Sequence, residues 1–184
     1  MRFRELKQAM ANHPPIISIV GKSNSGKTTL IERLIPFFKA RGYRVATIKH
    51  AGHGFDADHP GKDSYRHKAA GADAVMVASS TRFALIKDGA DLSLEDLAVH
   101  LRDMDLILTE GYKHADKPKI EVCRAERSQA FLCLDDPHLT ALVTDVAVQV
   151  EIVPVFGLDE VEALADFIAH RYLRQPSLGV AARL

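Results

Sequence analysis

Residues 21–29 of this chain, Gly-Lys-Ser-Asn-Ser-Gly-Lys-Thr-Thr, fit the phosphate-binding pattern G-x-x-x-x-G-K-[ST]. Gly21 and Gly26 allow the backbone to wrap tightly, so that successive N–H groups converge on one phosphate. Lys27 is placed to reach the outer phosphates, and the hydroxyl of Thr28 is a ligand for Mg²⁺. Because this loop works between a buried strand and the start of a helix, it constrains the fold around it as well as the ligand.

The flanking sequence supplies that strand and that helix. Residues 16–20, Ile-Ile-Ser-Ile-Val, are typical of a buried strand, and the residues after the loop predict a helix over 27–41. Further strands are predicted at 43–48, 74–78, 82–86, 105–109, 119–123, 140–144 and 153–156. Further helices are predicted at 62–70, from Ser93 onward, and at 158–172.

Apolar strands that alternate with helices indicate an α/β fold of the P-loop NTPase type, with a mainly parallel sheet and helices on both faces. We expect residues 1–184 to form a single nucleotide-binding domain. Residues 1–13 are interpreted as an amphipathic N-terminal extension and residues 174–184 as a frayed tail.

Charge and cysteine usage restrict the partners. The 24 basic residues balance the 24 acidic ones, which gives no indication of a nucleic-acid or membrane partner. The N-terminus carries charges where a signal peptide needs an apolar stretch, and no run of about 18 apolar residues is present. Cys123 and Cys133 are too few for a disulfide framework and are interpreted as reduced core thiols. A cytoplasmic location is therefore predicted.

A nucleotide site on this fold needs a carboxylate at the end of a strand beside the P-loop strand. Asp105 and Glu110 bracket the same predicted strand and are about 16 Å apart along it. Glu110 lies at the carboxyl edge, where the phosphates bind, so we assign Glu110 to the metal and Asp105 to the opposite end. Gly111 allows the backbone to approach the phosphates closely.

The polar segment 49–71 begins where the second predicted strand ends, again on the phosphate side. Asp56 and Asp58 are candidates for contact with the Mg²⁺ shell or for orienting a water molecule. Lys62 and Arg66, four residues apart, would share a helix face and grip a second anionic ligand, or they form an ordinary solvated basic face.

Four histidines of this segment, at positions 50, 53, 59 and 67, raise the alternative of a zinc or nickel site. No cysteine lies nearby, and the spacing matches no structural zinc pattern. A metal-delivery GTPase that carries nickel on this loop is thus the alternative function.

Several short motifs occur along the chain in a fixed order. They are Ser-Asn-Ser-Gly-Lys-Thr-Thr-Leu (23–30), Ile-Lys-His (48–50), Gly-Lys-Asp-Ser (61–64), Arg-His (66–67), Ala-Gly-Ala (70–72) and Leu-Thr-Glu-Gly-Tyr-Lys (108–113), with His53 and Asp58. Together they resemble the MobB family of molybdopterin-guanine dinucleotide biosynthesis adapter proteins. They cover residues 16 to about 125, in the family's order.

The resemblance implies a GTP-binding homodimer with weak GTPase activity. Such proteins assist the guanylyltransferase MobA, which attaches GMP to molybdopterin. The nucleotide would be held by the P-loop residues Gly21, Lys22, Ser23, Asn24, Ser25, Gly26, Lys27, Thr28 and Thr29, with Thr28 and Glu110 on Mg²⁺. Lys27 and Asp58 would be the catalytic residues. Lys62 and Arg66 would contact molybdopterin, as a bound ligand, or the partner enzyme.

Two residues carry open questions. Thr144-Asp145 follows a late strand, where a carboxylate can accept hydrogen bonds from the N1–H and amine of guanine; a simple turn aspartate is the alternative. Lys22 occupies the position of a lysine that, in some dimeric P-loop proteins, reaches the nucleotide of the partner subunit. No obvious glutamine orients the attacking water, which favours slow, partner-dependent hydrolysis or a pure adapter.

Overall fold

The computed structural model describes residues 13–52, 54–89 and 92–173. The chain divides into two compact units, one made of residues up to His50 and from Leu94 onward, the other of Ala51–Ser93. The organisation as a single nucleotide-binding domain stays a prediction. The predicted N-terminal extension and C-terminal tail lie outside the described residues, apart from His13. None of the described helices is long and apolar enough to cross a membrane.

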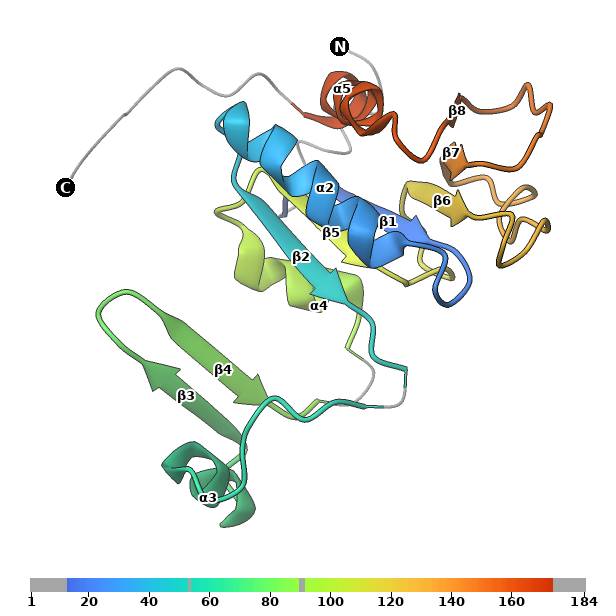
Figure 1. Ribbon diagram of the computed structural model, residues 1–184. Coiled ribbons are helices and arrows are strands. Elements are labelled where there is room, and N and C mark those ends of the chain that lie inside the picture. The colour runs from blue at the N-terminus through green and yellow to red at the C-terminus, as the bar shows by residue number, and fades with distance from the viewer. Residues whose placement is uncertain (1–12, 53, 90–91, 174–184) are drawn as a thin grey trace. The chain divides into compact units, whose positions relative to one another are not determined.

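The first unit contains a parallel sheet with the strand order β2-β5-β1-β6-β7-β8 (Figure 1). Its strands are β1 (Ile16–Val20), β2 (Val45–Lys49), β5 (Leu106–Glu110), β6 (Lys119–Cys123), β7 (Leu139–Thr144) and β8 (Val155–Phe156). The predicted parallel sheet is therefore confirmed. The second strand begins two residues later than predicted, because the backbone N–H of Tyr43 donates to the carbonyl of Phe38 at the end of the preceding helix.

Helices cover both faces of this sheet, as predicted (Figure 1). They are α2 (Lys27–Ala40), α5 (Val161–Tyr172) and α4 (Leu94–Ala98), which the short 3-10 helix η1 (Val99–Leu101) follows. The helices α2 and α5 pack on one face, with Phe38 and Ile168 at 0% exposure in the core. The helix α4 packs on the other face, where Leu94 and Ala98 contact Ile16 and Ile107.

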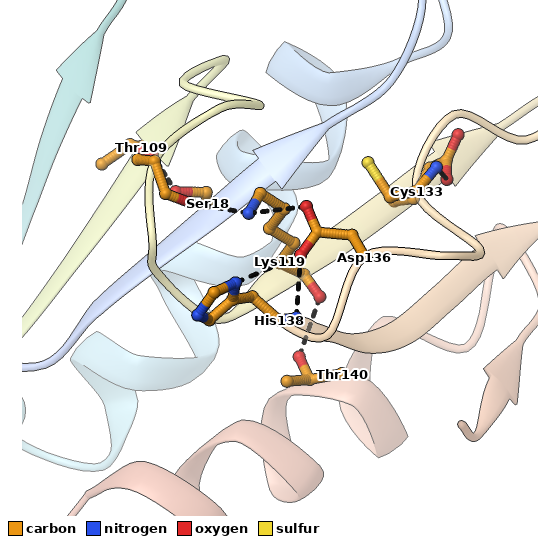
Figure 2. Close-up of polar contacts among 9 residues, drawn as sticks. Ser18, Thr109, Lys119, Cys133, Asp136, His138 and Thr140 are labelled. Carbon is orange, nitrogen blue, oxygen red and sulfur yellow. Dashed lines mark hydrogen bonds and ion pairs between the residues drawn. The ribbon is translucent and has the colours of Figure 1, made fainter. Parts of the chain in front are cut away.

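A segment without a helix joins β6 to β7, and two charged side chains of β6 hold it in place. Lys119 is 1% exposed, and its ammonium contacts the Asp136 carboxylate at 2.9 Å (Figure 2). The same ammonium donates to the Ala115 carbonyl at 2.6 Å. Burial alone would raise the pKa of Asp136, but hydrogen bonds from Lys119 and His138 and the Lys119 charge hold it below its ordinary value.

Glu121, 1% exposed, fixes the same segment two residues further along β6. Its carboxylate accepts hydrogen bonds from the backbone N–H groups of Leu132 and Cys133, at 2.6 and 2.9 Å. Burial raises the pKa of Glu121 in spite of these bonds. Cys123 and Cys133 are both free and buried, as predicted, and burial raises the pKa of the Cys133 thiol to about 11.

The second unit consists of α3 (Asp63–Ala69) and an antiparallel hairpin of β3 (Ala74–Ala78) and β4 (Phe83–Lys87). The prediction placed both strands and the turn between them within one residue. These two strands form a separate sheet and are not part of the parallel sheet of the first unit. The helix α3 packs against β3, where Val75 is buried, while Met76 and Phe83 are exposed.

Candidate nucleotide-binding site

The loop between β1 and α2 has the backbone conformation that its two glycines predict. Gly21 has φ 140°, and a Cβ at this position would lie 2.3 Å from the carbonyl oxygen of Val122 in β6. Gly26 precedes α2 with φ 97°, and its carbonyl accepts the first helical hydrogen bond from Leu30. A side chain at position 21 would therefore displace either the loop or β6, and the loop lies directly at the carboxyl edge of the sheet.

Thr28 and Glu110 meet beside this loop. The strand β5 pairs with β1 and places Glu110 opposite Ile19, one residue before the end of β1. The Thr28 hydroxyl donates to the Glu110 carboxylate over 3.0 Å. A hydroxyl and a carboxylate oxygen at this spacing are the ligand types that Mg²⁺ takes in P-loop sites. The two residues expected to share the metal are thus in contact, and their binding of Mg²⁺ stays a prediction.

Asp105 lies at the opposite end of β5, also as expected. Its carboxylate accepts a hydrogen bond of 2.7 Å from the backbone N–H of Arg44, and the Arg44 side chain is within 3.7 Å. Asp105 thus joins the chain before β2 to the chain before β5. It is a structural residue of the amino edge, remote from the loop.

Lys27 folds back over its own loop. Its ammonium donates to the carbonyl of Lys22 over 2.7 Å. Burial lowers the pKa of Lys27; Glu110 opposes this change, and the nearby charge of Lys49 adds to it. A phosphate group placed here would offer this ammonium a charged acceptor in place of a carbonyl.

The sequence reasoning missed the role of Lys49. This last residue of β2 is paired with Glu110 in the strand register, and its ammonium lies 3.5 Å from the Glu110 carboxylate. Its place at the carboxyl end of a strand predicted to neighbour the site was the available signal.

Gly111, the residue after Glu110, has φ 94°, and a Cβ at this position would lie 3.1 Å from the Cβ of His50.

On the other side of the loop, the segment after β6 carries two contacts that were not predicted. The Lys22 ammonium donates to the hydroxyl of Ser128 in the same chain over 2.6 Å. The Asp145 carboxylate accepts a hydrogen bond of 2.7 Å from the backbone N–H of Ala125. Asp145 is exposed, at the carboxyl end of β7, and joins the ends of β6 and β7.

Three predicted site residues belong to the second unit. The Asp58 carboxylate accepts hydrogen bonds from the His59 backbone N–H and from the Ser64 hydroxyl, and its second oxygen is buried without a partner. Arg66 forms an exposed ion pair with Asp63 at 3.7 Å, and Lys62 is exposed. The roles of these three residues stay predictions.

The histidine-based metal site has no geometric counterpart among the described residues. Within residues 13–52, 54–89 and 92–173, no three His, Cys, Asp or Glu side chains come together in a way that could hold a metal ion. His53 lies outside the described residues.

Comparison with known proteins identifies the family. The family model described as "Molybdopterin guanine dinucleotide synthesis protein B" matches residues 16–145. This range is most of the chain and includes both the phosphate-binding loop and Glu110. The chain belongs to the MobB family. It is 38% identical to the molybdopterin-guanine dinucleotide biosynthesis adapter protein of Escherichia coli, over 88% of this chain and 95% of that protein.

Other MobB proteins agree in sequence and in structure. The adapter protein of Haemophilus influenzae is 37% identical over 86% of this chain and 90% of its own length. The crystal structure of Bacillus subtilis MobB matches with a TM-score of 0.70 at 29% identity, over 87% of this chain and 98% of that chain. A crystal structure of molybdopterin-guanine biosynthesis protein B matches with a TM-score of 0.67 at 34% identity, over 84% of this chain and 98% of that chain.

Proposed function

We propose that this chain is a GTP-binding adapter protein of molybdopterin-guanine dinucleotide biosynthesis, with weak GTPase activity. One structural observation carries the proposal: the Thr28 hydroxyl meets the Glu110 carboxylate at 3.0 Å beside an intact phosphate-binding loop. The names of the relatives support the role in molybdenum cofactor biosynthesis.

The residues of the first unit fit GTP and Mg²⁺ in distinct ways. The backbone N–H groups of residues 21–29 would surround the phosphates, and Lys27 would exchange the Lys22 carbonyl for a phosphate oxygen. Thr28 and Glu110 would hold the Mg²⁺ ion, which neutralises charge on the outer phosphates. Lys49 holds the Glu110 carboxylate from the side of β2.

Slow hydrolysis follows from the same set of side chains. Phosphoryl transfer needs a group that orients water and an arginine that neutralises the developing charge. Lys27 would supply part of this charge, and Asp58 is the proposed carboxylate that orients water. Arg66, or an arginine of a partner, would complete the site, so hydrolysis would depend on assembly.

The second unit offers a surface for homodimerisation. In the hairpin register Met76 pairs with Leu85 and Ala78 pairs with Phe83, so these side chains share one face of the two-stranded sheet. Met76, Phe83 and Leu85 are 60%, 69% and 40% exposed. Adjacent apolar side chains of this size are typical of a protein–protein interface, and we assign this face to the second copy of the chain.

The partner enzyme would be the guanylyltransferase MobA, acting in the cytoplasm. Lys62 and Arg66, both exposed, would meet the anionic molybdopterin or the enzyme. Asp145 would read guanine through the carboxylate oxygen that is not bonded to Ala125.

Competition between GTP and ATP in the presence of Mg²⁺ tests this function, for the wild-type protein and for Lys27→Ala, Glu110→Gln and Asp145→Ala. We expect wild-type protein to prefer GTP, Lys27→Ala to lose binding, Glu110→Gln to lose its dependence on Mg²⁺, and Asp145→Ala to lose the preference. Single-turnover hydrolysis with and without the guanylyltransferase then measures partner dependence. Tighter binding of ATP than of GTP would contradict the proposal.

A further inference from the structure

A small pocket lies beside the phosphate-binding loop on its β6 side, away from Glu110 and Lys49. Its polar lining residues are Lys22, Ser25, Glu121, Arg124, Arg127 and Ser128. The proposed roles of the loop, the metal ligands and Asp145 leave Arg124 without a function, although it is the first residue after β6 and β6 pairs directly with the P-loop strand.

The main chain around Arg124 is firmly held. Its carbonyl accepts hydrogen bonds from the N–H groups of Arg127 and Ser128, both at 2.9 Å, and the next N–H donates to Asp145. The Arg124 side chain extends over the loop, where its Cδ lies 3.8 Å from the position that a Cβ would take at Gly26. The aliphatic part of the Arg124 side chain thus lies against the last glycine before α2.

Two polar atoms of this pocket are buried without a hydrogen-bond partner, the Nε of Arg124 and the hydroxyl of Ser25. Ser25 is only 2% exposed. The acid that lines the pocket, Glu121, is occupied by the N–H groups of Leu132 and Cys133. Among the described residues no carboxylate forms an ion pair with Arg124. A buried donor left unpaired destabilises the protein, and a ligand with acceptor atoms would supply the missing partner.

We propose that Arg124 binds a phosphate group of the nucleotide, from the β6 side of the loop and opposite the metal ligands. This inference rests on the proposed GTP binding and adds to it a phosphate contact from outside the loop. A guanidinium is suited to the task, because its planar array of N–H donors matches two phosphate oxygens at once. The Ser25 hydroxyl lines the same pocket and is free to donate beside it.

Dissociation constants for GTP and ATP with Mg²⁺ test this role in wild-type protein, Arg124→Gln, Arg124→Lys and Arg127→Gln. Arg127 is the matched control, since it lines the same pocket but its Nε lies 3.6 Å from Glu126. We expect Arg124→Gln to raise both constants by the same factor, about tenfold to a hundredfold, as for a lost charged hydrogen bond. Arg124→Lys should recover part of the loss, and Arg127→Gln should stay within about twofold of wild type.

Other results of these measurements would contradict either the role of Arg124 or the proposed function. Wild-type affinity in Arg124→Gln overturns the proposal. A changed ratio of GTP to ATP affinity would place Arg124 on the base and overturn the assignment to phosphate. The melting temperature of each variant without nucleotide checks that it is folded. If Arg124→Gln melts at a lower temperature than wild type, the dissociation constants of Arg124→Lys and Arg127→Gln are compared instead. Weaker binding by Arg124→Lys than by Arg127→Gln then supports the proposal, and equal binding overturns it. Undiminished binding by Lys27→Ala would instead overturn the proposed function.

Discussion

The two units of this molecule use strands of similar length and apolar content in opposite ways. In the first unit every residue of β1, Ile-Ile-Ser-Ile-Val, is buried. In the second unit β3, Ala-Val-Met-Val-Ala, buries only Val75, and β4 buries no residue. A two-stranded sheet with one short helix can cover one of its faces at most, whereas six strands between two helical layers bury both. Apolar sequence therefore predicts a strand, but the neighbouring elements decide whether it becomes core or surface.

The largest expected contrast is between two phenylalanines, one in each unit. Phe38→Ala, at a residue with 0% exposure, should lower the free energy of unfolding by about 3–5 kcal/mol, because the lost ring leaves a cavity in the core. Phe83→Ala, at 69% exposure, should change it by less than about 0.5 kcal/mol when the protein is dilute enough to be monomeric. Urea titration followed by circular dichroism measures both. Equal losses would contradict the comparison.

The next largest effect concerns the buried Lys119. Replacing it with Met should destabilise the protein by about 3 kcal/mol, because Asp136 keeps its charge and loses its partner. The pKa of Asp136 is lowered in the folded state, so its contribution is present above its ordinary value of 3.8 and is lost as the pH falls through the folded value. The difference between wild type and Lys119→Met should therefore shrink in acid. Urea titrations between pH 7 and pH 3 measure it, and a constant difference would argue against the ion pair.

A smaller effect is expected on self-association. Met76→Asp places a charge on the apolar hairpin face and should weaken the proposed dimer at least about tenfold, since the carboxylate would have to be desolvated. Val99→Asp, at a residue of the first unit with 42% exposure, is the control and should leave the dimer intact. Sedimentation equilibrium measures both. An unchanged dimer in Met76→Asp would remove the hairpin face from the interface.

The smallest effect is expected for the exposed ion pair of the second unit. Arg66→Gln breaks the pair with Asp63, whose side chains are 75% and 88% exposed, and should change the free energy of unfolding by less than about 0.5 kcal/mol. The same urea titration measures this change and compares it directly with Lys119→Met. A loss above about 1 kcal/mol would mean that the Arg66 side chain has a buried partner.

The sequence predicted the β1–loop–α2 segment closely, because its signals are local. Four apolar residues, two glycines and a lysine specify strand, turn and helix over a few residues. The contact between Thr28 and Glu110 was also predictable, because parallel strands bring their carboxyl ends to one edge. The buried face of α5, with Val161, Leu164, Ala165 and Ile168, followed from helical spacing in the same way.

The contacts of the β6 side were not predictable from local patterns. The ammonium of Lys22 reaches Ser128, which is 106 residues away in the sequence, and Arg124 lies over Gly26. Such pairs depend on the strand order, in which β6 lies beside β1. Likewise, a lysine at the start of an apolar strand gives no sign of its own that it will be buried against Asp136.

By itself, the sequence determined that a loop of the phosphate-binding type lies between a strand and a helix, and which residues form it, because backbone conformation there depends on glycine and on local spacing. It also predicted the MobB family, through motifs spread over residues 16 to about 125, and the family model that matches residues 16–145 confirms this prediction. Tertiary structure alone decided that the hairpin forms a separate sheet with one exposed apolar face, and that the Arg124 side chain lies against Gly26. Burial and long-range pairing arise from the packing of elements that are distant in the chain.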